Sequence, residues 1–260
     1  MRSGWNATRR NRNVGTGAHG HGSNNKLTIP ESRHEFKCFY EKLSSYVIVK
    51  RHVADHELQF LIEPTRLGWF YPCTIDDICF ALSHVPPAHV ATVNLVVMRQ
   101  PTRKQRVLSP VWGRAIFSFD VDGWGGAAIV LEAQNIEPVA WPVSLAPDSI
   151  RELERLRADG HRIARARRRV DIFTTPESLR NTVLYRTLLH ELGHHVDHAK
   201  SEPEPWMHRT LLSKEDFAHR YAAESLKRLT DLGVAPFAHR FNADDMRACG
   251  LQPEWFRADP

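Results

Sequence analysis

Two histidines and a glutamate stand in the stretch LLHELGHHVDH at spacings that suit metal chemistry. His190 and His194 are four residues apart, so on an α-helix their imidazoles lie one turn above each other on the same face. Two such nitrogens can bind one metal ion, and Glu191 then lies close enough to a water on that ion to take its proton. Zinc with an open position lowers the pKa of its bound water to about 7. The spacing therefore predicts a metal site that activates water.

The H-E-x-x-H pattern is the signature of zinc peptidases, although three fixed letters in five also occur by chance. The alternative is a surface helix that is merely rich in histidine. The surrounding sequence favours a buried helix, because Thr175-Pro176-Glu177 is a typical helix start and apolar residues recur at helical spacing as far as Val196. A histidine pair on the buried side of a helix needs a partner, since unpaired buried polar groups are costly. Metal binding supplies that partner.

Two histidines leave a zinc site incomplete, so we expect a third protein ligand. His198 lies four residues past His194, but three successive turns of a straight helix diverge too much to meet at one ion. Glu215 lies on the next predicted helix, which we expect to begin at Ser213, at a distance that fits a turn and an antiparallel return. Glu224 lies two turns further on and is expected to be out of reach. Taken alone, Glu215 would be an acid that stabilises the helix dipole; beside the histidine pair, it is predicted to be the third ligand.

Further histidines and an aspartate surround the predicted ligands. His219 lies one turn after Glu215, where it is expected to hydrogen-bond a ligand from behind. Asp197 shares the face of His194 and is expected either to orient a ligand or to close the helix against its neighbour. His195 and His198 are expected at the surface or behind the ligands.

The stretches HELGHHVDH and EDFAHRYAAESL together resemble the gluzincin zinc metallopeptidases. RTLLHELGHH and EDFAHRYAAESL are similar to the ImmA/IrrE-type peptidases, while HELGHHVD and EDFAHRY are similar to the anthrax lethal factor-like and Pro-Pro endopeptidase-like domains. The resemblance covers residues 183 to 228. It implies that His190, His194 and Glu215 bind zinc and that Glu191 is the general base. His219 departs from the Asn or Asp usual at its position in these families.

The rest of the chain predicts an α+β fold. β-Branched and aromatic runs indicate strands at residues 45–50, 58–63, 91–98, 114–119, 127–132 and 170–174, and helices are expected after Thr74 and Asp148. The resemblance implies a zincin-like arrangement, in which a twisted, mostly antiparallel sheet packs on the metal-bearing helix and helices after residue 200 complete a cleft. The strand at 127–132 is expected at the sheet edge, where a substrate strand would pair with it.

Charge is concentrated at the N-terminus. The chain carries a net charge of +5, and residues 1–30 hold five basic residues and no acidic one. We therefore predict a disordered basic tail over residues 1–30 and a single domain over residues 31–260. The tail and the arginine-rich run at 162–169 could contact nucleic acid, but solvated surfaces are favoured for both.

The composition is that of a globular protein. Of the residues, 42% are hydrophobic and 25% are charged, no run is long and apolar enough to span a membrane, and no secretory signal is evident. The four scattered cysteines indicate reduced thiols and a cytoplasmic location. The predicted function is a zinc-dependent metalloendopeptidase acting on proteins or peptides. The alternative is a catalytically silent zinc-binding regulatory module, with or without a nucleic-acid partner.

Overall fold

The structure is a computed structural model, which describes residues 38, 41–108, 111–201 and 203–258. The chain divides into two units, residues 1–39 and residues 40–260, and the second carries every element described below. The predicted tail at residues 1–30 lies outside the described residues, so the division into a tail and a domain at residue 31 stays a prediction.

A mixed five-stranded sheet forms the centre of the second unit, with strand order β1-β2-β3-β5-β4. Its strands are β1 (Val47–Val53), β2 (His56–Ile62), β3 (Leu95–Arg99), β4 (Gly113–Val121) and β5 (Trp124–Glu132). The α+β class is confirmed. The expectation of a mostly antiparallel sheet is wrong, because β3 runs parallel to both of its neighbours. Two helices, α1 (Ile75–Ser83) and α2 (Pro87–Val90), connect β2 to β3 and return the chain in the same direction.

The expected edge strand is also corrected. β5 lies between β3 and β4, so the edge of the sheet on this side is β4. Residues Ala128 to Leu131 of β5 are all buried. A continuous apolar run of this kind is typical of an interior strand covered on both faces, whereas an edge strand tends to alternate.

The two faces of the sheet carry separate hydrophobic clusters. The larger cluster packs β1, β2, β3 and β5 against α1 and against the helix that carries His190, through residues such as Ile78, Leu188 and Leu192. The smaller cluster lies on the opposite face and includes Leu95 and Val130. Thr74 begins α1 as predicted, since its side chain accepts a hydrogen bond from the Asp77 amide. Cys73, Cys79 and Cys249 are free thiols.

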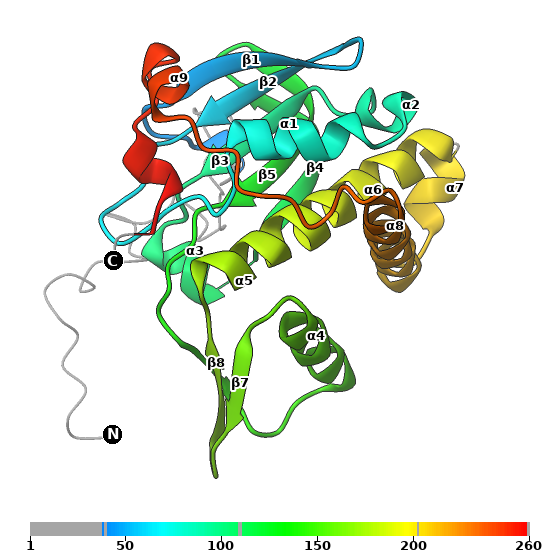
Figure 1. The fold of residues 1–260 in the computed structure, drawn as a ribbon. Helices are drawn as coiled ribbons and strands as arrows, with labels where there is room; N and C mark the ends of the chain where they lie inside the picture. Colours follow the sequence, from blue (N-terminus) through cyan, green and yellow to red (C-terminus); the bar gives the residue numbers. More distant parts are fainter. Residues whose placement is uncertain (1–37, 39–40, 109–110, 202, 259–260) are drawn as a thin grey trace, which may run out of the picture. The chain divides into compact units, whose positions relative to one another are not determined.

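The helix carrying His190 is one part of a longer rod (Figure 1). α5 (Pro176–Arg180) continues through a π-helical segment (Asn181–Thr187) into α6 (Leu188–Lys200). The predicted start is confirmed: Thr175 is the N-cap and accepts a hydrogen bond from the Ser178 amide. The π-helical segment was not predicted, and such segments are frequent near functional sites.

The chain after α6 is helical, with α7 (Pro203–His208), α8 (Leu211–Asp231), α9 (Ala243–Ala248) and a final 3₁₀ turn (Pro253–Phe256). The N-cap of α8 is Thr210 rather than the predicted Ser213, whose amide instead donates to the Thr210 side chain. None of the described helices is both long and apolar enough to cross a membrane.

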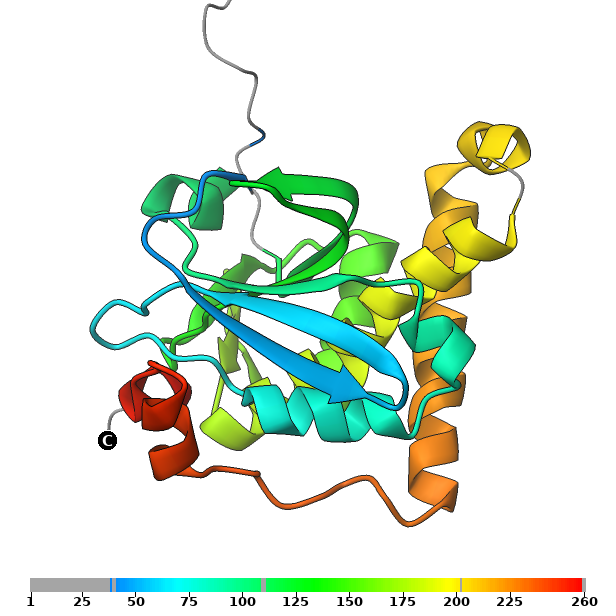
Figure 2. The same cartoon turned by 90° about the horizontal axis from the view of Figure 1, so that it is seen from above.

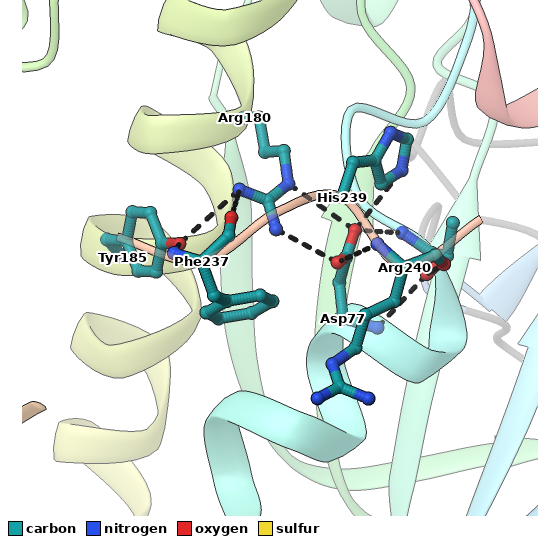
Figure 3. A network of polar contacts seen from close by, with 7 residues as sticks. Asp77, Arg180, Tyr185, Phe237, His239 and Arg240 are labelled. Carbon is teal, nitrogen blue, oxygen red and sulfur yellow. Dashed lines mark hydrogen bonds and ion pairs between the residues drawn. The ribbon is translucent and has the colours of Figure 1, made fainter. Parts of the chain in front are cut away.

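The segment between α8 and α9 runs back along α1 (Figure 2). It is held there by Asp77, a fully buried residue of α1 that accepts hydrogen bonds from the side chain of Arg180 and from the backbone amide of Arg240 (Figure 3). His239 lies 3.2 Å from the same carboxylate. The C-terminal segment is thus tied to the start of the rod.

A small second sheet with strand order β6-β8-β7 packs on α4 (Pro147–Ala158). Its strands are β6 (Val139–Pro142), β7 (Arg162–Arg165) and β8 (Arg169–Phe173), and the remaining helix, α3 (Arg103–Leu108), precedes β4. α4 begins one residue before the predicted cap, Asp148, which lies in its first turn. The arginines of the 162–169 run are all exposed, as expected for a solvated face.

Candidate metal centre

The crossing of α6 and α8 brings the predicted ligands together. It is tightest at Gly193, where an added Cβ would lie 3.1 Å from the Cα of Ala218 and 3.1 Å from Cδ1 of Tyr221. A side chain at this position would push the helices apart, so glycine permits the close approach. Ala218 lies one turn after Glu215 on α8, and this contact therefore sets how near Glu215 comes to the histidines of α6.

His190, His194 and Glu215 point at a common position. The Nε2 atoms of the two histidines are 3.1 Å apart. The Oε2 atom of Glu215 lies 3.3 Å from Nε2 of His190, and its Oε1 atom lies 3.5 Å from Nε2 of His194. Ligands bound to zinc at about 2.0–2.1 Å in a tetrahedron are about 3.4 Å from each other. Each of these distances is close to that value, with one oxygen of Glu215 nearest to each histidine.

The protonation states also suit metal binding. Burial lowers the pKa of His194 to about 4, so its imidazole is neutral at pH 7 and has a lone pair to offer. A hydrogen bond with His190 lowers the pKa of Glu215, which keeps it a carboxylate. Two imidazole nitrogens and one carboxylate oxygen are a donor set that zinc accepts in catalytic sites. The residues present therefore fit this ion.

Glu191 lies beside the same position. One ligand-type atom from each of His190, Glu191 and His194 falls within 4.8 Å of the other two. Burial raises the pKa of Glu191 to about 7, and the effect is opposed by His190 and by a backbone hydrogen bond from Ala115 on β4. The edge strand thus helps to orient this carboxylate. A carboxyl group with a pKa near the working pH can accept a proton and return it.

His219 lies closer to the centre than predicted. Its ring centroid is 4.4 Å from that of His190, with the ring planes tilted by 44°, and its ligand-type atom lies within 4.8 Å of those of His190 and Glu215. The expected hydrogen bond behind the ligand is not formed at His190 Nδ1, which is buried and has no hydrogen-bond partner among the described residues. The two rings contact each other in a tilted arrangement instead.

Asp197 closes α6 against the next segment, the second of its two predicted roles. Its Oδ1 accepts a hydrogen bond from Nη1 of Arg209 at 2.7 Å, and its Oδ2 accepts one from Nε1 of Trp206 at 3.2 Å. Both oxygens are thereby engaged by the chain between α6 and α8. Since that chain leads directly into α8, the contact helps to aim α8 at the metal centre.

The expectation for the other two histidines is wrong for His195. Only 2% of its surface is exposed, and its Nε2 lies 3.0 Å from the carbonyl oxygen of Ala128. The bond anchors α6 on the interior strand β5. His198 packs against the rings of Phe117 and Trp206, at centroid distances of 4.7 and 4.8 Å. In the described part of the chain, these contacts direct His195 and His198 toward other partners than the three predicted ligands.

A cleft of about 580 Å³ opens onto the metal centre. Gly113, Arg114 and Ala115 of β4 line one side of it, and Trp206 and Leu211 line another. Its volume lies within the range of small-ligand sites and is sufficient for several residues of an extended peptide. The cleft therefore exposes the edge strand and the ligands to the same incoming molecule.

Two features that position the cleft were missed by sequence reasoning. An added Cβ at Gly113 would lie 2.7 Å from Cγ2 of Thr187 and 2.8 Å from the carbonyl oxygen of Val130, so only glycine lets β4 press against the π-helical segment. Arg186 of that segment bonds Glu152 and Asp159 of the α4 region, each at 2.8 Å. Nothing in the local sequence of Gly113 marks it as a contact.

Comparison with protein-family models, with curated proteins and with solved structures finds no match. The resemblance to gluzincins therefore rests on the two motifs alone and stays a prediction. What argues for a function is the arrangement of side chains at the crossing of α6 and α8.

Proposed function

We propose that the protein is a zinc-dependent endopeptidase of the gluzincin type. One observation carries the proposal: two imidazole nitrogens and a carboxylate from two helices lie 3.1, 3.3 and 3.5 Å apart, which are the separations of zinc ligands. A fourth position is left for water or substrate, as in catalytic rather than structural zinc sites. The cleft on that side makes this position accessible.

The roles of the residues follow from their places. Zinc held by His190, His194 and Glu215 would polarise the scissile carbonyl and acidify a water molecule. Glu191 takes a proton from the water as its oxygen bonds to the carbonyl carbon. The same carboxyl group then gives that proton to the nitrogen as the carbon–nitrogen bond breaks, releasing an amine and a carboxylic acid. The pKa of about 7 that burial gives Glu191 suits both transfers.

The edge strand β4 offers a place for the substrate backbone. The carbonyl oxygen of Trp112 accepts a hydrogen bond from the Glu132 amide of β5, so the next residue, Gly113, directs its backbone polar groups away from β5. Ala115 has the same orientation, and its amide contacts Glu191. An extended peptide that adds to this edge would lie along the cleft. β4 thus takes the substrate role expected for the strand at 127–132.

The proposed substrate is a protein or a peptide. We also propose that the reaction takes place in the cytosol, because free thiols such as Cys73, Cys79 and Cys249 are typical of a reducing compartment.

The test combines metal analysis with hydrolysis of a proteome-derived peptide pool. The purified wild-type chain should hold one equivalent of zinc and generate new peptide termini. Glu191→Gln should keep the zinc, and its rate of hydrolysis should fall by about two to four orders of magnitude, because the proton acceptor is gone while the three ligands remain. Full activity of Glu191→Gln would refute the proposal, and so would zinc-loaded wild-type protein that cleaves nothing in the pool.

A further inference from the structure

A second cavity lies on the face of α8 opposite the metal centre. It has a volume of about 330 Å³ and shares no lining residue with the cleft. The turn from α1 into α2 forms one wall, Lys200 at the end of α6 forms another, and the α8 residues from Phe217 to Arg228 that turn away from Glu215 form the third. Nothing in the proposed reaction uses it.

Positive charge gathers in this cavity. Lys200, Arg220 and Arg228 line it, against one carboxylate, that of Glu224. All three side chains are exposed, and in the described part of the chain no carboxylate lies within ion-pair distance of any of them. The cavity is therefore lined by three positive charges and one negative charge.

The charges of Lys200 and Arg228 also affect His89, which lines the same cavity. Burial lowers the pKa of His89, and the charges of Lys200 and Arg228 lower it further, so both cations are near this ring. Nδ1 of His89 lies 3.0 Å from the hydroxyl of Tyr221. Two cations therefore lie near an imidazole and a phenol hydroxyl that bond each other, and these cations can hold an anion that accepts several hydrogen bonds.

The remaining lining is apolar. Val85, Pro86 and the ring of Phe217 complete the walls, and the guanidinium of Arg220 lies 5.8 Å from the centroid of the Phe217 ring. A small inorganic ion would leave this part of the cavity unused. An organic molecule with a charged end and an apolar or planar end would use both parts.

We propose that this cavity is a binding site for a small phosphate ester. Arginine suits the phosphate because its planar guanidinium offers paired donors to phosphate oxygens, and Lys200 adds a third cation. Val85, Pro86 and Phe217 would contact the organic part. Such a ligand would bridge α2, α6 and α8 beside Tyr221, whose hydroxyl contacts His89. The site does not depend on the proposed peptidase activity.

The test uses the full chain and phenyl phosphate as the probe. Isothermal titration should give saturable binding, and thermal unfolding should move to higher temperature with rising probe concentration, since a ligand bound only to the folded state stabilises it. Arg228→Ala should weaken the binding by about tenfold or more, because it removes a charge-assisted contact. Lys227→Ala is the matched control: it removes a cation one residue away that pairs with Asp231, and it should bind like the wild type.

Equal binding of phenyl phosphate by Arg228→Ala and by the wild type would overturn the proposal. It would also be overturned if phenol, or sodium chloride at matched ionic strength, raised the unfolding temperature as much as phenyl phosphate does. A second arm separates a free phosphate ester from a lipid headgroup. Phosphatidylcholine vesicles with and without phosphatidic acid are sedimented with each protein. Sedimentation that needs phosphatidic acid and Arg228 would assign the site to a lipid headgroup, whereas binding of phenyl phosphate alone would assign it to a free ester. Binding of neither probe would rule the site out.

Discussion

Two clusters in this protein place histidines beside a carboxylate, and they are built in opposite ways. At Asp77 every nearby donor is used: the carboxylate accepts bonds from Arg180, from the amides of Thr74 and Arg240, and lies 3.2 Å from His239 (Figure 3). At the candidate metal centre, the polar groups bond one another, and each of them could also bind a cation. The nitrogens of His190 and His194 are 3.1 Å apart and both face the oxygens of Glu215.

The difference shows what each cluster needs. A buried carboxylate surrounded by donors is complete, and its role is to hold three segments together. Polar groups that bond one another and are also suitable zinc ligands can exchange those bonds for a metal ion. One cluster should therefore govern the stability of the protein without metal, and the other should govern its response to metal.

The largest expected effect on stability comes from breaking the Asp77 cluster. Asp77→Ala leaves the guanidinium of Arg180 buried without its carboxylate, and losing one partner of a buried ion pair costs about 3–5 kcal/mol. The free energy of unfolding, measured in urea without zinc, should fall by that amount. Asp76→Ala is the control, since its neighbouring carboxylate is half exposed and 3.8 Å from Arg51, and it should cost under about 1 kcal/mol. Equal losses in the two variants would contradict the contrast between the clusters.

Removing a ligand should instead abolish the response to zinc. At a free zinc concentration a hundred times the Kd, the wild type should gain about 2.7 kcal/mol of unfolding free energy. Glu215→Ala should gain little, while Asp216→Ala, the adjacent exposed acid on α8, should gain as much as the wild type. The measurement is urea unfolding with zinc in a metal buffer, compared with zinc-free samples. A Glu215→Ala variant that zinc stabilises fully would show that Glu215 is not a ligand.

The sequence allowed the grouping of His190, Glu191, His194 and Glu215 to be predicted better than the sheet around it, and the reason is physical. His190, Glu191 and His194 are related by helical periodicity, a local property, and Glu215 lies near the start of a later helix that packs on theirs. The order of strands depends on pairing between distant segments, such as Leu95 with Ala128, for which no local signal exists. β4 was therefore predicted as a strand but not as the edge.

The positions of single side chains at long-range contacts were equally hidden. His195 was expected at the surface or behind the ligands because it adjoins a ligand in a histidine-rich stretch, yet helical geometry turns it toward β5, where the carbonyl oxygen of Ala128 accepts its hydrogen bond. The tight contacts of Gly113 and Gly193 arise only when separate elements meet. The local sequence of the π-helical segment likewise does not distinguish it from an α-helix.

Acid should weaken the packing of α6 through His195. Burial lowers its pKa to about 4 from an ordinary 6.5, so the unfolded chain binds more protons than the folded one between these values. Its contribution to stability is complete above pH 6.5 and is lost as the pH falls toward 4, which amounts to about 2 kcal/mol at pH 5. His195→Gln keeps an amide donor without this titration, so its unfolding free energy should fall less between pH 7 and pH 5. His208→Gln, at an exposed position, should follow the wild type; an unchanged pH slope in His195→Gln would refute the account.

The smallest expected effect is on zinc affinity, and it tests the helix crossing without removing any of the predicted ligands. In Gly193→Ala all three ligands remain, but the new methyl group meets the backbone of Ala218 at 3.1 Å, which must move α8 and with it Glu215 by a few tenths of an ångström. Zinc affinity should fall by about tenfold, or about 1.4 kcal/mol, because ligand geometry is displaced without any loss of chemistry. Competition with a chromogenic chelator gives the affinity, and circular dichroism checks that the helices are retained. The Asp77 cluster does not contact Gly193, so a loss of zinc affinity with intact helices would be an effect of the helix crossing. An unchanged zinc affinity would show that the crossing does not set the ligand geometry.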